Sequence, residues 1–171
     1  MTRPDPVVVA RAVLRKLACE VPVDPYDAAA RHGIEIVERD LEESVSGMLV
    51  WRGNRAVIGV NRRHHPNRRR FTVAHELGHY LLHRELASVF VDGPGVLYRD
   101  LSSSEGSRQH EIDANRFAAE FLLPEAAVRE CLGEQSVDAH DEITIRALAE
   151  RFRVSPQALT IRLTRLGLIT G

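Results

Sequence analysis

The sequence predicts an α+β fold, in which a small three-stranded antiparallel sheet packs on two long helices and a C-terminal helical hairpin follows. Three observations predict it. Runs rich in β-branched residues lie early in the chain, at residues 34–38, 47–51 and 55–60. Two segments with strong helical periodicity follow, at residues 67–83 and 111–124. With 171 residues, 44% of them hydrophobic, the chain can bury one substantial core.

The N-terminal part predicts two helices before the sheet, at Val7–Ala18 and Tyr26–His32. Each follows an Asp-Pro pair, in which aspartate is a favoured cap and proline suits the first helical position. In the sheet, Gly53-Asn54 between the second and third strands is typical of a two-residue hairpin. We therefore expect the three strands to form one antiparallel sheet.

The most informative motif is H-E-x-x-H, formed by His75, Glu76 and His79 within the predicted helix 67–83. Residues four apart share one helix face, with about 5–6 Å between Cβ atoms, so the two histidines can bind one metal ion. Glu76 lies about 100° round the helix and reaches the same space. This is the ligand, ligand and base arrangement of a zinc metalloprotease. The alternative is a solvated, charged helix face that carries two histidines.

A metal ion held by two histidines in a hydrolase needs a third protein ligand and an open position for water. Glu111 is the best candidate, with Asp113 and His110 as alternatives. Asn115 lies on the same face as Glu111 and can fix the tautomer of a ligand histidine through a hydrogen bond. Glu111 could instead be an acid that complements the helix dipole. A His/His/Glu set suits zinc best, with manganese and iron as alternatives.

Two further features surround this motif. His83, one turn beyond His79, is either a second hydrogen-bonding partner of a ligand or a helix-end histidine favoured by the helix dipole. The segment Arg84–Arg108 has little periodicity and predicts a long loop, either a lid or part of the substrate cleft. A short edge strand is expected there at residues 89–91 or 96–98.

The C-terminal part predicts a helix-turn-helix-like pair broken at Ser155-Pro156. We place a catalytic domain at residues 1–130 and this extension at residues 140–171. Arginines outnumber acids in it, namely Arg146, Arg151, Arg153, Arg162 and Arg165. DNA binding is one interpretation, but a hairpin that packs on the first domain or grips a substrate is favoured, because one module of modest charge would bind DNA weakly. The arginine-rich run Asn61–Arg70 is interpreted as a solvated turn.

Composition narrows the class of protein. The net charge of −1 does not indicate a globally basic nucleic-acid binder. Cys19 and Cys131 are far apart and are expected to be buried free thiols of a cytoplasmic protein. No apolar run approaches the roughly 20 residues that span a membrane, and the N-terminus lacks a convincing signal peptide. We expect a soluble, cytoplasmic protein without a membrane partner, while its oligomeric state is open.

Together, FTVAHELGHYLLH at residues 71–83 and EIDANRFAAEFLLP at residues 111–124 resemble the ImmA/IrrE family of bacterial metallo-endopeptidases. The resemblance covers roughly Val7–Pro124. It implies a compact zincin-like fold, with His75, His79 and Glu111 as zinc ligands and Glu76 as catalytic base.

Some members of that family are encoded by mobile elements and cleave a helix-turn-helix transcriptional repressor, which derepresses its genes. The resemblance implies such a repressor as the substrate. We expect the short antirepressor type, because the chain has no room for the large sensor-like domain of the radiation-response members.

Two other functions are also compatible with parts of the sequence. One is a catalytically idle regulator that binds DNA or a repressor partner through its C-terminal helices. The other is a different H-E-x-x-H hydrolase such as a peptide deformylase. Deformylases pair this helix with an upstream cysteine ligand in a glycine-rich segment, and Cys19 lacks that setting.

Overall fold

The computed structural model describes residues 4–52, 55–83, 89–92 and 104–171, and it has the predicted α+β architecture. The elements are α1 (Pro6–Lys16), α2 (Pro25–Arg31), β1 (Glu35–Arg39), β2 (Gly47–Arg52), β3 (Arg55–Asn61), α3 (Pro66–His83), β4 (Val89–Asp92), α4 (Ser104–Leu122), α5 (Glu125–Leu132), β5 (Val137–Asp138), α6 (Glu142–Phe152), α7 (Pro156–Leu166) and β6 (Ile169–Thr170).

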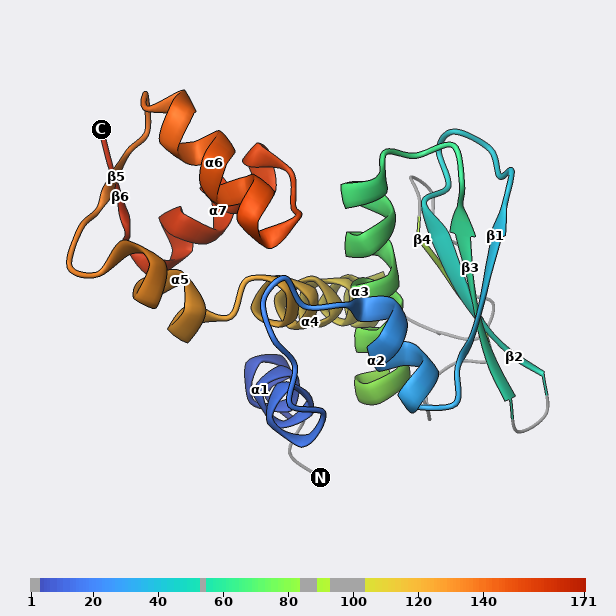
Figure 1. The fold of residues 1–171 in the computed structure, drawn as a ribbon. Helices are drawn as coiled ribbons and strands as arrows, with labels where there is room; N and C mark the ends of the chain where they lie inside the picture. Colours follow the sequence, from blue (N-terminus) through green and yellow to red (C-terminus); the bar gives the residue numbers. More distant parts are fainter. Residues whose placement is uncertain (1–3, 53–54, 84–88, 93–103) are drawn as a thin grey trace.

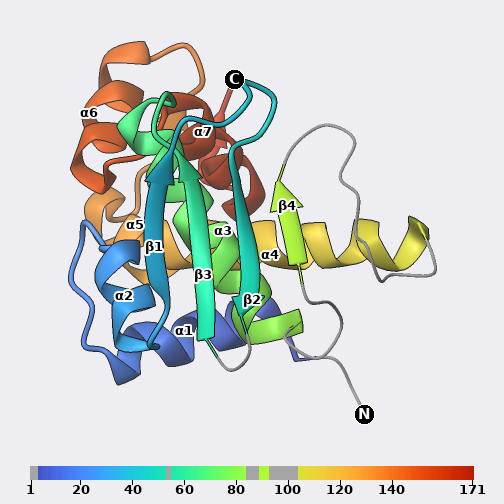
Figure 2. The ribbon, with the colours of Figure 1, turned by 90° about the vertical axis from the view of Figure 1, so that its right-hand side faces the viewer.

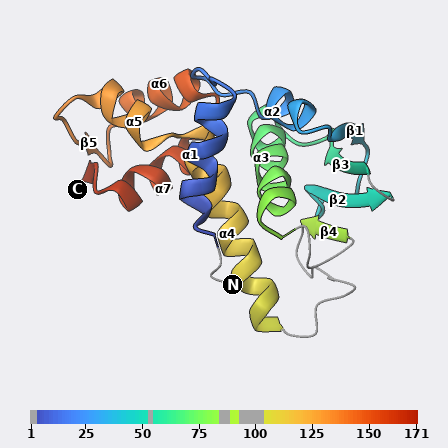
Figure 3. The same cartoon turned by 90° about the horizontal axis from the view of Figure 1, so that it is seen from below.

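The elements form successive layers, which Figures 1 and 3 show from two directions. The first four strands form one side of the molecule, and α3 lies against them with α2 beside it. Helix α4 crosses α3 on the side away from the sheet and packs against α1. Helices α5, α6 and α7 form the end of the molecule farthest from the sheet. Helix α3 is therefore the central element, in contact with both the sheet and α4.

The sheet differs from the predicted one. It has four strands in the order β1-β3-β2-β4, as Figure 2 shows face on. β2 pairs antiparallel with β3, as predicted, but β1 pairs parallel with β3, with Glu35 opposite Val57 and Arg39 opposite Asn61. The expectation of three antiparallel strands was therefore wrong. The predicted Gly53-Asn54 turn lies outside the described residues.

The physical reason for the parallel pair is the connection between β1 and β2. Asn61, fully buried at the end of β3, donates from Nδ2 to the carbonyl oxygens of Glu42 and Val45 at 3.1 Å and 2.9 Å. These bonds hold the connection across the end of the sheet. β2 therefore enters on the far side of β3, and β1 is left to pair with β3 in the same direction.

Both long helices exist, and their crossing is unusually close. At Gly78 of α3, an added Cβ would lie 3.1 Å from Cδ1 of Phe117 and 3.3 Å from the Cα and carbonyl oxygen of Ala114. Glycine costs about 1 kcal/mol of helix stability relative to alanine, and here it allows the two helices to touch. Leu77 and Phe117 are fully buried at this crossing and belong to the core.

Helix α4 starts earlier than the sequence indicated. It begins at Ser104, so the expectation of a loop through Arg108 was wrong for residues 104–108. The expected edge strand at residues 89–91 is present as β4, which pairs with β2. The alternative strand at residues 96–98 lies outside the described residues.

Helices α1, α2 and α7 begin directly after the capping residues that the sequence indicated. Asp5 and Asp24 accept hydrogen bonds from the backbone of the first turns of α1 and α2. Ser155 accepts from the amide of Ala158 and caps α7, and Gly167 ends that helix with φ of +67°. In the described part of the chain, no helix combines the length and the apolar character needed to cross a membrane.

Candidate metal centre

Three predicted ligand atoms converge where α3 crosses α4. Nε2 of His75 lies 3.0 Å from Nε2 of His79, and the carboxylate oxygens of Glu111 lie 3.2 Å and 3.1 Å from these two nitrogens. The two histidines are buried and Glu111 is half-buried. Among the described residues, these three form the group of histidine, cysteine and acidic side chains able to hold a metal ion.

The second nitrogen of each histidine has a partner of its own. Nδ1 of His75 lies 3.2 Å from Oδ1 of Asn115, so that this ring nitrogen faces away from Glu111 and Nε2 faces it. Nδ1 of His79 lies 3.1 Å from Nδ1 of His83, which is itself buried. Such contacts fix the tautomer and ring orientation of metal-binding histidines. The structure thus brings Asn115 and His83 to the positions that the sequence suggested.

The protonation states suit a cation. Burial lowers the pKa of His79 to about 4; its hydrogen bond to Glu111 opposes this shift, and His75 adds to it. Burial acts to raise the pKa of Glu111, but hydrogen bonds with His75 and His79 outweigh it and hold that pKa at about 2. At neutral pH the group therefore contains an ionised carboxylate beside a neutral His79, and only a neutral imidazole can bind a metal ion.

Glu76 is fully buried on α3 between the two histidines in sequence. Strand β2 approaches it at Gly47, where an added Cβ would lie 2.4 Å from Cγ2 of Thr72 and 3.7 Å from Oε1 of Glu76. No larger residue fits at Gly47 without displacing Thr72. The close approach of β2 thus sets one boundary of the space around the Glu76 carboxylate.

The alternative ligands do not join the group. Asp113 is buried, and its carboxylate accepts a hydrogen bond from Nε2 of Gln109 at 2.9 Å. His110 is also buried, with its ring 4.5 Å from that of His83. Cys19 and Cys131 are free thiols, as expected, although both are half-buried, and neither belongs to the group.

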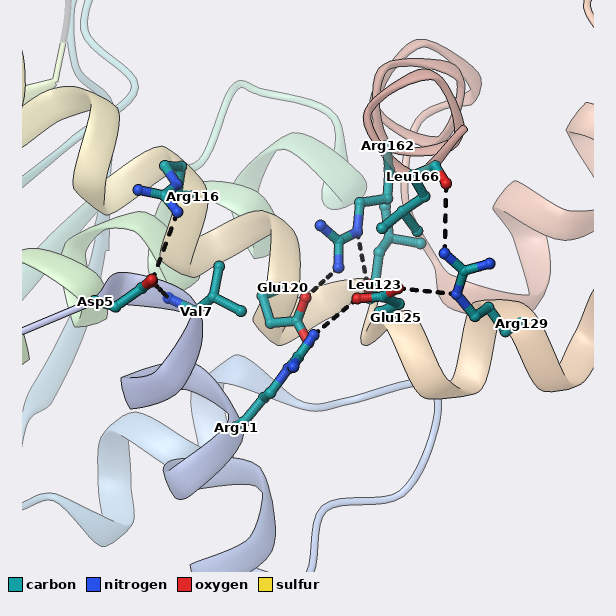
Figure 4. Close-up of polar contacts among 10 residues, drawn as sticks. All are labelled: Asp5, Val7, Arg11, Arg116, Glu120, Leu123, Glu125, Arg129, Arg162 and Leu166. Carbon is teal, nitrogen blue, oxygen red and sulfur yellow. Dashed lines mark hydrogen bonds and ion pairs between the residues drawn. The ribbon is translucent and has the colours of Figure 1, made fainter. Parts of the chain in front are cut away.

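Sequence reasoning missed a second buried polar cluster. Glu120 on α4 accepts from Nε of Arg11 at 2.7 Å and from Nη2 of Arg162, whose Nε donates to the carbonyl of Leu123 at 3.0 Å (Figure 4). The cluster joins α1, α4 and α7. Arg162, one of the arginines that outnumber the acids of the C-terminal helix pair, is buried and does not face outward. No sequence signal separates it from exposed arginines such as Arg165.

The arginine-rich run is only partly the solvated turn that was expected. Arg62 makes two 2.6 Å hydrogen bonds to Asp40, and Arg69 pairs with Glu38 at 2.7 Å. Arg70 is buried and donates from Nε to the carbonyl of Arg153 at 3.2 Å. This run therefore binds α3 to β1 and to the turn between α6 and α7.

Comparisons with known proteins found a family model, a relative and a solved structure that resemble this chain. The family model of the Peptidase M78, IrrE N-terminal-like domain matches residues 29–164. "Uncharacterized immunity region protein 2" of Bacillus phage phi105 is 30% identical over 105 residues, which make up 61% of each chain. A solved structure, a Mycobacterium tuberculosis transcriptional regulator, has a TM-score of 0.61 at 24% identity.

The shares of the two matched proteins that this chain covers limit the conclusions that these similarities support. The match covers 94% of this chain but 47% of the solved regulator, and at that identity it shows the fold alone. This chain likewise spans less than two thirds of the phage protein. The family match, by contrast, runs through the whole of helices α3 and α4, which carry His75, His79 and Glu111, and it confirms the resemblance noted in the sequence. The chain belongs to the Peptidase M78 family, whose defining unit is the IrrE N-terminal-like domain.

Proposed function

We propose that the protein is a metal-dependent endopeptidase whose metal ligands are His75, His79 and Glu111. The observation that carries this proposal is the convergence of two imidazole Nε2 atoms and one carboxylate within 3.0–3.2 Å of one another. Ligand atoms around a tetrahedral ion with bonds of about 2.0–2.1 Å lie about 3.3 Å apart. The two imidazole nitrogens, and the Glu111 oxygen nearest to each of them, already have nearly this separation.

Zinc fits this donor set best. Two imidazole nitrogens and one carboxylate oxygen make a three-ligand zinc site that leaves one position for water or substrate, although manganese and iron bind similar sets. A bound zinc ion would supply a Lewis acid that polarises the scissile carbonyl and lowers the pKa of water towards about 7.

The other site residues have distinct roles in this proposal. Glu76 acts as general base, accepting the proton of the attacking water and delivering it to the leaving amine. Its full burial keeps the carboxylate away from bulk solvent. Asn115 and His83 touch no substrate in this scheme and act as positioning residues, because they orient His75 and His79.

For the substrate, we propose a helix-turn-helix transcriptional repressor in the cytoplasm. The support is indirect: the phage relative is named as an immunity region protein, and the solved neighbour as a transcriptional regulator. A catalytically idle DNA-binding regulator is the weaker alternative. All residues of the hydrolytic set are present, and α7 uses Arg162 to bind Glu120 rather than to face outward.

The decisive test replaces Glu76 with glutamine, which keeps the size of the side chain but removes the base. We expect Glu76→Gln to bind metal as the wild type does and to lose at least about 10²-fold in the rate of repressor cleavage. The assay incubates the metal-loaded protein with purified helix-turn-helix repressors encoded beside its gene and follows the fragments by mass spectrometry. Wild-type cleavage rates in the Glu76→Gln variant would refute the assignment.

A further inference from the structure

A groove with a volume of about 610 Å³ lies between α3, α4 and α7. Its apolar lining includes Phe71 from α3, Ala118 and Leu122 from α4, and Ala158 and Ile161 from α7. Ile161 is 48% exposed and adds a large apolar side chain to this lining. The groove therefore offers apolar surface that the described part of the chain leaves exposed.

The groove continues directly from the metal group. On α3, Arg68 and Phe71 line the groove and share a helix face with His75, which follows them. On α4, Asn115 and Ala118 line it and share a helix face with Glu111, which precedes them. Asn115 both lines the groove and contacts His75, and the ring of Phe71 lies 6.4 Å from that of His75. A polypeptide in the groove thus leads to the proposed catalytic site.

The rim of the groove is basic. Arg68 and Arg165, both exposed, line it from opposite sides, and exposed His65 lies at the end near α6. Buried Arg162 also lines it, but its charge is compensated by Glu120. None of the described residues that line the groove is acidic. The groove therefore has a positive rim above an apolar floor.

The groove keeps its shape because the C-terminal hairpin is fixed at several points. Arg162 ties α7 to Glu120 and to the carbonyl of Leu123 on the α4 side. Asn67 donates from Nδ2 to the carbonyl of Val154 at 2.9 Å, next to the bond from Arg70 to Arg153. These contacts hold α7 opposite α3 and α4, so the groove exists before any partner binds.

We infer that this groove is the docking site for an acidic segment of the protein substrate that carries apolar side chains. The apolar floor takes the side chains, and Arg68 and Arg165 pair with carboxylates beside them. Docking here holds the neighbouring part of the substrate at the His75, His79 and Glu111 group. This inference rests on the proposed peptidase function, and it gives the C-terminal hairpin a role in substrate selection.

The test uses the metal-loaded Glu76→Gln protein, which should bind without cleaving. The probe is a fluorescein-labelled twelve-residue peptide that alternates pairs of leucine and glutamate, and its control has lysine in place of glutamate. Fluorescence anisotropy should show tighter binding of the glutamate peptide. Ile161→Glu and Arg165→Glu, each added to that protein, should weaken its binding about tenfold.

Matched controls separate docking from a general change of charge. Ile143→Glu and Arg151→Glu make the same substitutions at exposed positions of α6 that do not line the groove, and they should leave binding unchanged. In addition, Arg165→Glu should reverse the preference, so that the lysine peptide binds better. Loss of folding cannot produce this reversal.

Several results would overturn the inference. Equal binding of the two peptides, or equal losses in the α6 controls, would show that the groove does not select an acidic segment. A short DNA duplex that competes for the groove and loses affinity on Arg165→Glu would point to nucleic acid. Self-association that Ile161→Glu abolishes would point to a second copy of this chain. Absence of repressor cleavage by the metal-loaded wild type, with peptide binding intact, would instead refute the peptidase proposal.

Discussion

Helix α4 carries two carboxylates that each contact two nitrogen-containing side chains from other helices, and the two pairs of partners differ in their charge. Glu120 meets two guanidinium groups, those of Arg11 and Arg162, which carry positive charge at every relevant pH. Glu111 meets two imidazoles, those of His75 and His79. Of these, His79 is neutral at neutral pH, because burial lowers its pKa to about 4.

This difference separates a structural cluster from a binding site. The Glu120 cluster contains its own countercharge, so it is complete within the folded chain and joins α1, α4 and α7. The Glu111 cluster instead gathers imidazole nitrogens around a carboxylate. Such a donor set can bind an added cation, whereas the guanidinium groups of the first cluster cannot.

The largest expected effect on stability comes from removing the carboxylate of the Glu120 cluster. Glu120→Ala would leave Arg162 buried without its carboxylate, which typically destabilises a protein by about 3–5 kcal/mol. Denaturant unfolding should show this loss both with and without metal. Glu125→Ala is the control, since that acid also binds Arg11 but is half-buried, and it should cost less than about 1 kcal/mol. Equal losses for the two variants would contradict the comparison.

The second prediction concerns the group formed by His75, His79 and Glu111. Zinc at 100 times its dissociation constant should stabilise the wild type by about 3 kcal/mol, because metal binds the folded state. Glu111→Ala should abolish this gain while changing the stability of the metal-free protein far less than Glu120→Ala does. Asp113→Ala should keep the gain, as that carboxylate is outside the group. The reverse result would move the third ligand to Asp113.

The same contrast explains what the sequence could predict. His75, Glu76 and His79 were found because helical spacing alone brings side chains four apart onto one face. Glu111 and Asn115 followed because a zinc site demands a third ligand and a hydrogen-bonding partner. These inferences depend on local geometry or on chemistry, and both can be read from residue order.

Features set by tertiary packing could not be predicted in this way. The pairing of Glu120 with Arg162 joins residues from different helices, and neither lies in a recognisable motif. The parallel pairing of β1 with β3 depends on Asn61 holding a connection made elsewhere in the chain. The early start of α4 at Ser104 was hidden because serine and glycine there are typical of loops.

A smaller effect is expected from the residues that orient the ligands. Asn115→Ala removes the acceptor for Nδ1 of His75 and should weaken zinc binding about 10–100-fold, as competition with a chromophoric chelator would measure. Asn115→Asp keeps an oxygen acceptor and should retain most of the affinity. Arg116→Ala, at the neighbouring exposed position, is the matched control and should have no effect. Full affinity in Asn115→Ala would show that His75 needs no such partner.

The smallest effect is a dependence of stability on pH that belongs to the metal cluster. The pKa of His79 is about 4 in the folded protein against 6.5 for the unperturbed group, so the unfolded chain takes up its proton first on acidification. The contribution of His79 to stability is complete above pH 6.5 and is lost as pH falls towards 4. For the metal-free protein, the stability lost between neutral pH and pH 5.5 through His79 amounts to about 1 kcal/mol.

Glu111 works in the same direction, but its pKa of about 2 against 4.5 confines its contribution to pH values below 4.5. The range between pH 6.5 and 4.5 therefore separates the contribution of His79 from that of Glu111. Denaturant unfolding across this window should show falling stability in the wild type and a shallower slope in His79→Asn, which has no titrating group at that position. The guanidinium groups around Glu120 stay charged throughout, so Arg162 adds no slope there. An unchanged slope in His79→Asn would place the proton uptake elsewhere and remove the evidence that His79 is held neutral for a metal.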